Sequence, residues 1–343
     1  MINIINKIIG LLIAQSLLVS ADTLYVDNDT SHPADFRTLL AAYDAASDGD
    51  VIILAPSANP YDGLVVQKKI TIKGNGFGGD APPNLLGSPV VATISSAITL
   101  GGTADQDEYL SAQGAVLESL RITAGVTVNS SRCFLKRCLI SSQVLFKSPG
   151  LTIEGCLIDA SLTLNSSSFI FTDGSGTIYS TSLNARNSIF LGSVSAQYTA
   201  SFDYCIFRGR SGRSTPGHNL RNAVVRNSIF GRYQGSVDSH PGNTLNCLFI
   251  DTAAIFGNSA DCLTGTYEDT FTDEGDWGAY FQIKAGSSAL TASTEGGEIG
   301  AFGGPTPFKV GGYPPVPRIL KADMISANPT TGITFKIEAE ARD

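Results

Sequence analysis

A short motif that recurs along the middle of the chain constrains its fold more than any other sequence feature. Each copy has a small residue, Cys or Ser, next to apolar residues, and the small residues stand at positions 119, 138, 156, 188, 205, 228 and 247. The spacings are 17 to 23 residues, apart from one gap of 32. A period this short excludes a repeat of two helices and fits one turn of a β-solenoid. The long gap is either two coils whose middle signal has degenerated or one coil with an insertion.

The coils of a solenoid cannot bury their apolar side chains alone, so they stack about 4.8 Å apart with equivalent residues over one another. The composition agrees with short strands and tight bends, because the chain has 36 glycines and only 16% charged residues, too few for the surface of a helical bundle. The sequence therefore predicts an all-β protein, a single-stranded right-handed parallel β-helix over residues 22–304, with a short N-terminal capping helix and an extended C-terminal tail.

The two residues before each small residue carry a pattern of their own. The nearer one is Asn or Gly in four copies, and both tolerate the left-handed backbone of a sharp bend. The farther one is charged in five central copies, with alternating sign: Lys136, Glu154, Arg186, Asp203 and Arg226. We expect this column to face outward as a ladder of ion pairs, each worth about 0–1 kcal/mol; a binding stripe is the alternative.

Six cysteines invite a disulfide interpretation, but their register favours another. They are Cys133, Cys138, Cys156, Cys205, Cys247 and Cys262. Four of them share the repeat position with serines, which is typical of a small core residue, so we expect buried thiols. Neighbouring coils would also give their parallel side chains poor disulfide geometry. No spacing of Cys or His indicates a zinc site.

Residues 36–43 have the spacing of a short amphipathic helix. Phe36, Leu39, Leu40 and Tyr43 stand at i, i+3, i+4 and i+7, and Asp35 is a candidate N-cap. An open solenoid end exposes strand edges and apolar core, so we expect this helix to cover the N-terminal end. Residues 51–54, 64–66 and 70–72 are expected to form the first strands.

Stretches at both ends of the repeat region carry a family resemblance. They are residues 24–28, 36–43 and 48–54 at the start, and residues 286–290 and 298–304 at the close. With the repeats, they make residues 22–310 similar to the pectate-lyase-like superfamily of right-handed parallel β-helix proteins, and more narrowly to its secreted bacterial members of unassigned activity. The resemblance implies the fold and leaves the activity open.

The N-terminus resembles a secretory signal. Lys7 precedes an apolar run over residues 8–19, and small residues up to Ala21 form a cleavage site. The run is short for a membrane span. We therefore expect residues 1–21 to be removed and the chain to be secreted, extracellular or periplasmic, without a membrane span. The net charge of −8 argues against nucleic acid as a general partner.

The composition changes after Gly304. Five prolines between residues 305 and 317 predict an extended linker. Weak alternation over residues 318–343 predicts either a strand or hairpin, docked on the solenoid or used as an edge, or a frayed tail. Residues 305–343 are accordingly assigned to a Pro-rich linker and C-terminal tail.

Two consecutive insertions, residues 208–222 and 231–243, hold a local concentration of basic residues. Insertions on neighbouring coils can project from one face and form the wall of a groove. Arginine pairs bidentately with carboxylate or sulfate, so these insertions are a candidate site for an acidic polysaccharide or a cell-surface component. The candidate binding residues are Arg208, Arg210, Arg213, Arg221, Arg232, Tyr233 and His240. The alternative is a solvated loop whose arginines aid solubility.

The resemblance also suggests what catalysis would require. Lyases of this superfamily use Arg or Lys to take a proton next to a uronate, often with Ca²⁺, and Arg210, Arg213 and His218 are the candidates here. The chain lacks the Trp-Val-Asp-His and Arg-x-Pro-x-x-Arg motifs of pectate lyases. It also lacks the paired aspartates, Gly-His-Gly and Arg-Ile-Lys of polygalacturonases. These departures favour a protein without catalytic activity.

An acidic cluster before Trp277 offers candidate Ca²⁺ ligands in Asp269, Asp273 and Asp276. No EF-hand spacing is present, and a solvated acidic turn is the alternative; no other cofactor is expected.

Three functions stay open. The first is an extracellular β-helix that binds carbohydrate or a surface partner without catalysis. The others are a polysaccharide lyase or glycoside hydrolase acting on an acidic polysaccharide, and a structural or adhesive module.

Overall fold

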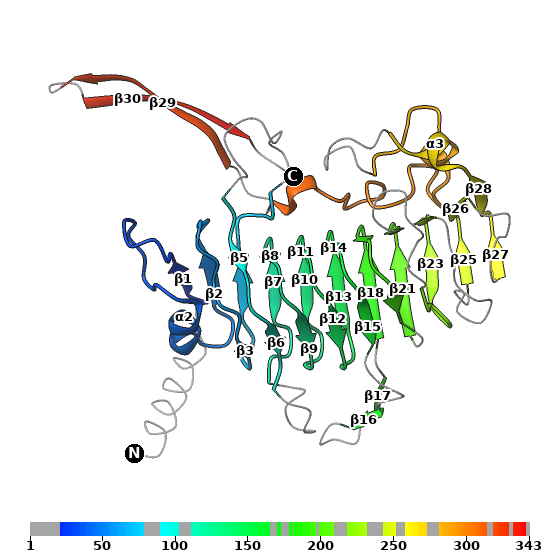
Figure 1. The fold of residues 1–343 in the computed structure, drawn as a ribbon, viewed down its shortest axis with the longest axis horizontal. Helices are drawn as coiled ribbons and strands as arrows, with labels where there is room; N and C mark the ends of the chain where they lie inside the picture. The colour runs from blue at the N-terminus through cyan, green and yellow to red at the C-terminus, as the bar shows by residue number, and fades with distance from the viewer. Residues whose placement is uncertain are drawn as a thin grey trace, which may run out of the picture.

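The chain forms the predicted right-handed parallel β-helix, which in the described part of the chain is built from three parallel sheets of 11, 9 and 6 strands (Figure 1). The computed structural model describes residues 21–78, 90–102, 111–164, 170–172, 178–180, 182–196, 199–208, 218–231, 243–251, 258–272, 281–313, 318–328 and 332–340. Each complete coil contributes one strand to sheet A, then one to sheet B, then one to sheet C.

The three sheets are defined by their strands in chain order. Sheet A contains β1 (Thr23–Val26), β2 (Val51–Leu54), β4 (Thr71–Lys73), β7 (Val116–Glu118), β10 (Phe134–Lys136), β13 (Leu151–Glu154), β18 (Ser182–Arg186), β21 (Thr199–Asp203), β23 (Val224–Arg226), β25 (Asn243–Leu245) and β27 (Asn258–Ala260). Sheet B contains β5 (Thr93–Ile94), β8 (Arg121–Ile122), β11 (Leu139–Ile140), β14 (Leu157–Ile158), β19 (Ile189–Phe190), β22 (Ile206–Phe207), β24 (Ile229–Phe230), β26 (Leu248–Ile250) and β28 (Leu263–Gly265). Sheet C contains β3 (Val65–Val66), β6 (Ile98–Leu100), β9 (Val126–Val128), β12 (Val144–Phe146), β15 (Leu162–Leu164) and β20 (Val194–Ser195).

The gap of 32 residues is one coil with an insertion. Strands β13, β14 and β15 pair directly with β18, β19 and β20, so no coil lies between them. The insertion includes an antiparallel pair, β16 (Ile170–Thr172) and β17 (Ile178–Ser180). Of the two interpretations that the spacing allowed, the second is confirmed.

The first copy of the repeat was aligned one residue out of register. Because Glu118 pairs with Lys136, Ser119 matches Arg137 at the bend, and Leu120 takes the position that Cys138 occupies in the next coil. Ser119 and Arg137 both have a left-handed backbone, with φ of 55° and 51°. The same position recurs on the last coil, where Cys262 follows the left-handed Asp261.

The repeat position accepts Cys or Ser because both side chains satisfy the backbone at the bend. Ser188 Oγ donates to the Arg186 carbonyl at 2.8 Å and accepts from the Cys156 N–H of the preceding coil at 3.1 Å. Cys156 Sγ contacts the Glu154 carbonyl at 3.5 Å and accepts from the Cys138 N–H at 3.4 Å. All six cysteines are free thiols; Cys262 is partly exposed and the other five are buried, as expected.

The charged column is a ladder of alternating sign on the outer face of sheet A, as predicted. The pairing places Lys136, Glu154, Arg186, Asp203 and Arg226 in one register. Arg186 pairs with Glu154 at 2.8 Å, and the ladder extends to Lys73, which lies 3.8 Å from Glu118. All of these side chains are partly or fully exposed, so each pair contributes about 0–1 kcal/mol.

A short helix covers the N-terminal end of the β-helix, as predicted, but it begins later than expected. Helix α2 (Leu39–Ala45) has Thr38 as its N-cap, whose Oγ1 accepts from the Ala41 N–H at 3.1 Å. Asp35 is not the cap, because its carboxylate accepts from the Tyr25 N–H at 2.9 Å. Leu39 and Ala42 are buried.

Stacked phenylalanines fill the interior beneath sheet B. Phe190, Phe207, Phe230 and Phe249 lie on successive coils, with neighbouring ring centroids 5.3, 4.8 and 5.0 Å apart. The preceding residue on each strand lies on the opposite face of the sheet, because side chains alternate along a strand. These outer residues, Ile189, Ile206, Ile229 and Leu248, belong to a second apolar cluster outside sheet B.

The second cluster is covered by residues 281–313, here called the closing segment, which runs back along sheet B (Figure 1). It includes two short 3₁₀ helices, η3 (Ser288–Thr291) and η4 (Val310–Gly312). The left-handed asparagines at the bends hold it: Asn246 Nδ2 donates to the Ala292 carbonyl at 3.0 Å, and Asn187 Nδ2 to the Gly303 carbonyl at 2.7 Å. The contact continues to Gly311, whose carbonyl accepts from the Phe77 N–H at 2.7 Å.

The remaining described elements lie outside the sheets. Helix α3 (Tyr267–Thr270) follows the last coil, and β29 (Arg318–Asn328) pairs antiparallel with β30 (Gly332–Glu340). The tail therefore forms a hairpin, but among the described strands its two pair only with each other and it extends away from the β-helix in Figure 1, so the expected use as a docked or edge strand is wrong. Residues 305–313, assigned to the linker by composition, still contact the β-helix.

Within the described ranges, no helix has the length and apolar character needed to cross a membrane. The expected signal, residues 1–20 in particular, lies outside them.

Candidate ligand site

Three of the predicted basic and catalytic candidates lie in described parts of the chain. Arg208 directly follows β22, and His218 lies beside β20. Arg221 precedes β23 in the chain, and it is exposed. The others lie outside the described residues: Arg210, Arg213, Arg232, Tyr233 and His240.

Arg208 packs beneath an aromatic layer formed by α3 and the closing segment. Its guanidinium lies 4.0 Å from the Tyr267 ring centroid, 5.7 Å from that of Phe271 and 5.3 Å from that of Phe281. Its residue is only 7% exposed. A cation over aromatic faces is stabilised by about 1–2 kcal/mol when desolvated, so in this position Arg208 fixes α3 to the last coils.

His218 is an interior residue. Residues 218–220 occupy the place of a sheet C strand, with Asn219 bridged to Ser195 of β20. The His218 Nδ1 accepts from the Val194 N–H at 3.1 Å, and the ring lies edge-on to Phe207 at 5.5 Å. Burial lowers the pKa of His218 to about 4, so the ring is neutral at pH 7. A general acid or base needs access to substrate, which a residue that is 2% exposed lacks.

Because His218 is buried, the free energy of unfolding should decrease as the pH is lowered from about 6.5 to about 4. The unfolded chain binds a proton near its ordinary pKa of 6.5, whereas the folded chain binds it only near 4, so the stabilisation is complete above pH 6.5 and is lost as pH falls. The shift corresponds to about 3 kcal/mol. Urea denaturation of wild type and His218→Gln across this range measures it. Identical pH slopes for the two proteins would contradict the assignment.

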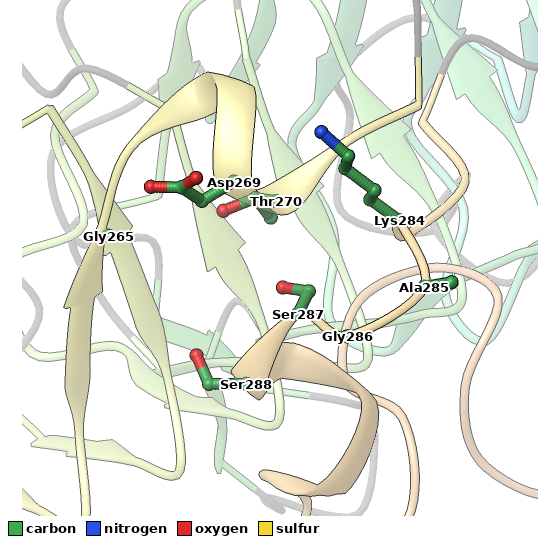
Figure 2. Close-up of a pocket in the computed structure, with 8 residues that line it drawn as sticks. All are labelled: Gly265, Asp269, Thr270, Lys284, Ala285, Gly286, Ser287 and Ser288. Atoms are coloured by element: carbon green, nitrogen blue, oxygen red, sulfur yellow. The ribbon is translucent and has the colours of Figure 1, made fainter.

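A polar surface pocket of about 280 Å³ lies between α3 and the start of the closing segment. Figure 2 shows α3 on one side of it and the loop after Lys284 on the other. It is lined by Gly265, Asp269, Thr270, Lys284, Ala285, Gly286, Ser287 and Ser288.

Backbone pairing between α3 and the closing segment builds this pocket. Thr266 caps α3, with its Oγ1 accepting from the Asp269 N–H at 3.2 Å. The Lys284 N–H donates to the Thr270 carbonyl at 2.8 Å, and the Thr272 N–H donates to the Gln282 carbonyl at 3.0 Å. Gly286 then turns with φ of 87°, a left-handed conformation that glycine adopts without strain.

The pocket combines opposite charges with hydroxyl groups. Asp269 Oδ2 accepts from Thr266 Oγ1 at 2.7 Å, and Lys284 Nζ donates to the Glu268 carbonyl at 3.3 Å. Among the residues that the structure describes, no carboxylate pairs with Lys284 within 4 Å. The residues that line this one pocket therefore include a lysine, an aspartate and two serines, which carry both hydrogen-bond donors and acceptors.

Asp269 is the one predicted Ca²⁺ ligand within the described residues, since Asp273 and Asp276 lie outside them. In the described ranges, no group of three or more His, Cys, Asp or Glu side chains gathers in a way that would hold a metal ion. Lys284 lines the same pocket as Asp269, and a positive charge in the neighbourhood disfavours a cation and favours an anionic or hydroxyl-bearing ligand.

The sequence patterns did not indicate the other pocket residues. Lys284, Ser287 and Ser288 are ordinary surface residues by type, and only their docking beside α3 brings them to Asp269. The stretch over residues 286–290 carries family resemblance, which does not indicate a site. A weak signal was available in the polar run that surrounds Gly286.

Comparison with solved structures finds chains of similar fold, and one of them is a pectate lyase. The crystal structure of pectate lyase Pel9A is similar, with 12% sequence identity, a TM-score of 0.44, and coverage of 84% of this chain and 98% of that chain. No protein-family model matches the chain. No curated protein matches it either. The assignment of the fold rests on the strand pairing, independently of this likeness.

Proposed function

We propose that this protein is an extracellular β-helix that binds an acidic carbohydrate without catalysis, and that the pocket beside α3 holds one sugar residue. The observation that carries the proposal is that Lys284, Asp269, Ser287 and Ser288 line one pocket of about 280 Å³. This volume lies just below the range typical of small-molecule sites, about 300–1,000 Å³, which suits a single ring.

Each group has a role in this proposal. Lys284 pairs with the carboxylate or sulfate of the sugar, because its ammonium is a compact charge with three donors. Asp269 accepts hydrogen bonds from ring hydroxyls, and Ser287 and Ser288 donate or accept according to the hydroxyl that faces them. Among the described residues that line the pocket, Asp269 is the one with a carboxylate, whereas hydrolysis of a glycosidic bond commonly needs two carboxyl groups about 5–9.5 Å apart.

The polymer would run past the pocket on the outside of the β-helix. The outer face of sheet B is filled by the closing segment, which leaves the loop after Lys284 as the exposed rim of the site. Secretion, directed by the expected signal over residues 1–21, is part of this proposal because a secreted chain meets polysaccharides in the medium or on a cell surface. The cationic insertions are part of it as well.

Lys284→Gln should weaken binding of polygalacturonate about tenfold or more. A hydrogen bond to a charged group is worth about 1.5–3 kcal/mol, and about 1.4 kcal/mol is a factor of ten. Asp269→Asn should weaken binding by a similar factor, because it replaces one acceptor oxygen with a donor. Isothermal titration of the purified protein with polygalacturonate oligomers measures both.

The matched control is Glu268→Gln, at an exposed acid of the same helix that does not line the pocket. It should leave the affinity within about twofold of wild type. Equal affinities for wild type, Lys284→Gln and Asp269→Asn would sink the assignment of the pocket.

A further inference from the structure

The last two coils place two cysteines in register. Strands β26 and β28 pair in parallel, with Leu248 opposite Leu263, and the residues before them are Cys247 and Cys262. Equivalent residues of adjacent strands lie about 4.8 Å apart, which is within the Cα separation of about 4.4–6.8 Å that a disulfide spans.

This pair differs from its counterpart in the middle of the β-helix. Cys138 and Cys156 have the same relation, since Leu139 pairs with Leu157, but both are fully buried. Cys262 is partly exposed, and β28 is a terminal strand of sheet B among the described strands. An edge strand can move by the small amount that brings two parallel side chains into bonding geometry, whereas a strand held on both sides cannot.

The two thiols of the terminal pair differ in acidity. A hydrogen bond from Cys247 lowers the pKa of the Cys262 thiol to about 6, so Cys262 is largely thiolate at neutral pH. Burial raises the pKa of the Cys247 thiol well above its ordinary value, as it does for Cys138, so Cys262 is the thiol that attacks first. Since the thiolate is the nucleophile in disulfide exchange, the exposed end of the column is the reactive one.

We propose that Cys247 and Cys262 form a disulfide by exchange with a low-molecular-weight disulfide such as oxidised glutathione, and thereby staple the last coil to the one before it. The Cys262 thiolate attacks one sulfur of the reagent, its S–S bond breaks, and one glutathione thiolate leaves. Cys247 then attacks the Cys262 sulfur of the mixed disulfide, and the second glutathione leaves with the Cys247 proton. Two protein thiols are oxidised and one glutathione disulfide is reduced to two thiols.

The staple would act on the strand that leads to the candidate pocket. Strand β28 ends at Gly265, which lines the pocket, and Thr266 follows as the cap of α3. A disulfide at Cys262 would therefore restrain the end of the β-helix on which the pocket is built. The proposal stands whether or not the pocket binds a sugar.

The test exposes the full-length protein to oxidised glutathione at pH 7.5 and maps cysteines by digestion and mass spectrometry without reduction. We expect a peptide pair joined through Cys247 and Cys262, a higher Tm than that of the reduced protein, and Cys138 and Cys156 still reduced. Two free thiols at Cys247 and Cys262 after treatment, or equal oxidation of the Cys138–Cys156 pair, would overturn the proposal.

Two serine variants separate the steps. Cys247→Ser should fold, because Ser188 and Ser228 occupy the same position in other coils, and it should trap glutathione on Cys262. Cys262→Ser should abolish both the cross-link and the rise in Tm. A stable mixed disulfide on Cys262 in the wild-type protein, with Cys247 reduced, would show that the edge strand does not move close enough and would contradict the proposed staple.

Discussion

Replacing Phe230 with alanine should lower the free energy of unfolding by about 3–5 kcal/mol, the usual cost of removing a buried phenylalanine. Phe230 is 1% exposed and stacks between Phe207 and Phe249, at centroid distances of 4.8 and 5.0 Å. The neighbouring coils are fixed by strand pairing on both sides, so the surroundings cannot collapse into the cavity. Urea denaturation followed by circular dichroism measures the change.

Phe134→Ala is the matched control, because it makes the same substitution on the outside of sheet A. Phe134 is partly exposed and lies beneath Lys136, whose Nζ is 5.1 Å from the ring centroid. We expect a loss of about 1 kcal/mol or less. Equal losses for the two variants would show that the stacked rings are not the core of the coil.

Replacing Asn227 with alanine should lower the free energy of unfolding by about 2–4 kcal/mol and loosen the closing segment. The Asn227 Nδ2 donates to Asp203 Oδ1 at 2.9 Å, and its Oδ1 accepts from the Thr294 N–H at 2.9 Å. Alanine loses both contacts and must adopt the left-handed backbone, at φ of 47°. Denaturation gives the stability, and limited proteolysis should cut residues 281–313 faster in the variant.

Asn227→Gly separates the two causes. Glycine adopts the left-handed conformation without strain, as Gly155 does at the equivalent bend with φ of 61°, but it has no amide. We expect Asn227→Gly to recover about 1 kcal/mol of the loss and to leave the closing segment loosened. Wild-type stability and wild-type proteolysis in Asn227→Gly would contradict the role of the amide.

The coil architecture could be predicted from the sequence because stacked coils place similar residue types at equivalent positions, so these types recur at the spacing of one coil. The alternating charges from Lys136 to Arg226 and the interchange of Cys with Ser both follow from equivalent positions lying over one another. The misalignment of Ser119 has a simple cause: Leu120 occupies the position that holds Cys or Ser in the later coils, and a serine stands directly before it.

The closing segment could not be predicted in the same way. Its contacts with the asparagines join residues from 46 to 116 positions apart, and they run through backbone groups such as the Gly303 carbonyl, which leave no periodic pattern. The asparagines at the bends were explained by their left-handed backbone alone. Their amides have the second task of holding the segment, and nothing in the spacing of Asn187, Asn227 and Asn246 indicates it.

The candidate site shows the same limit. Composition indicates a basic region around Arg208 and His218. It could not show that Arg208 packs against the Tyr267 ring, or that His218 is buried where a strand of sheet C would lie. The pocket beside α3 depends on two segments meeting, and only Asp269 among its residues had been singled out. In this β-helix, the residues that line the pocket are thus determined by the segments that pack on the outside of the coils, more than by the repeated residues of the coils.

The most direct test of the account is retention of the purified protein on immobilised polysaccharides, acidic and neutral, with and without Ca²⁺, while the eluate is assayed for unsaturated and reducing ends. We expect retention on an acidic polysaccharide, no product, and loss of retention in Lys284→Gln. Release of product would make the protein an enzyme and contradict binding without catalysis. No retention on any acidic polysaccharide of the panel would contradict the proposed binding function and favour a structural or adhesive role.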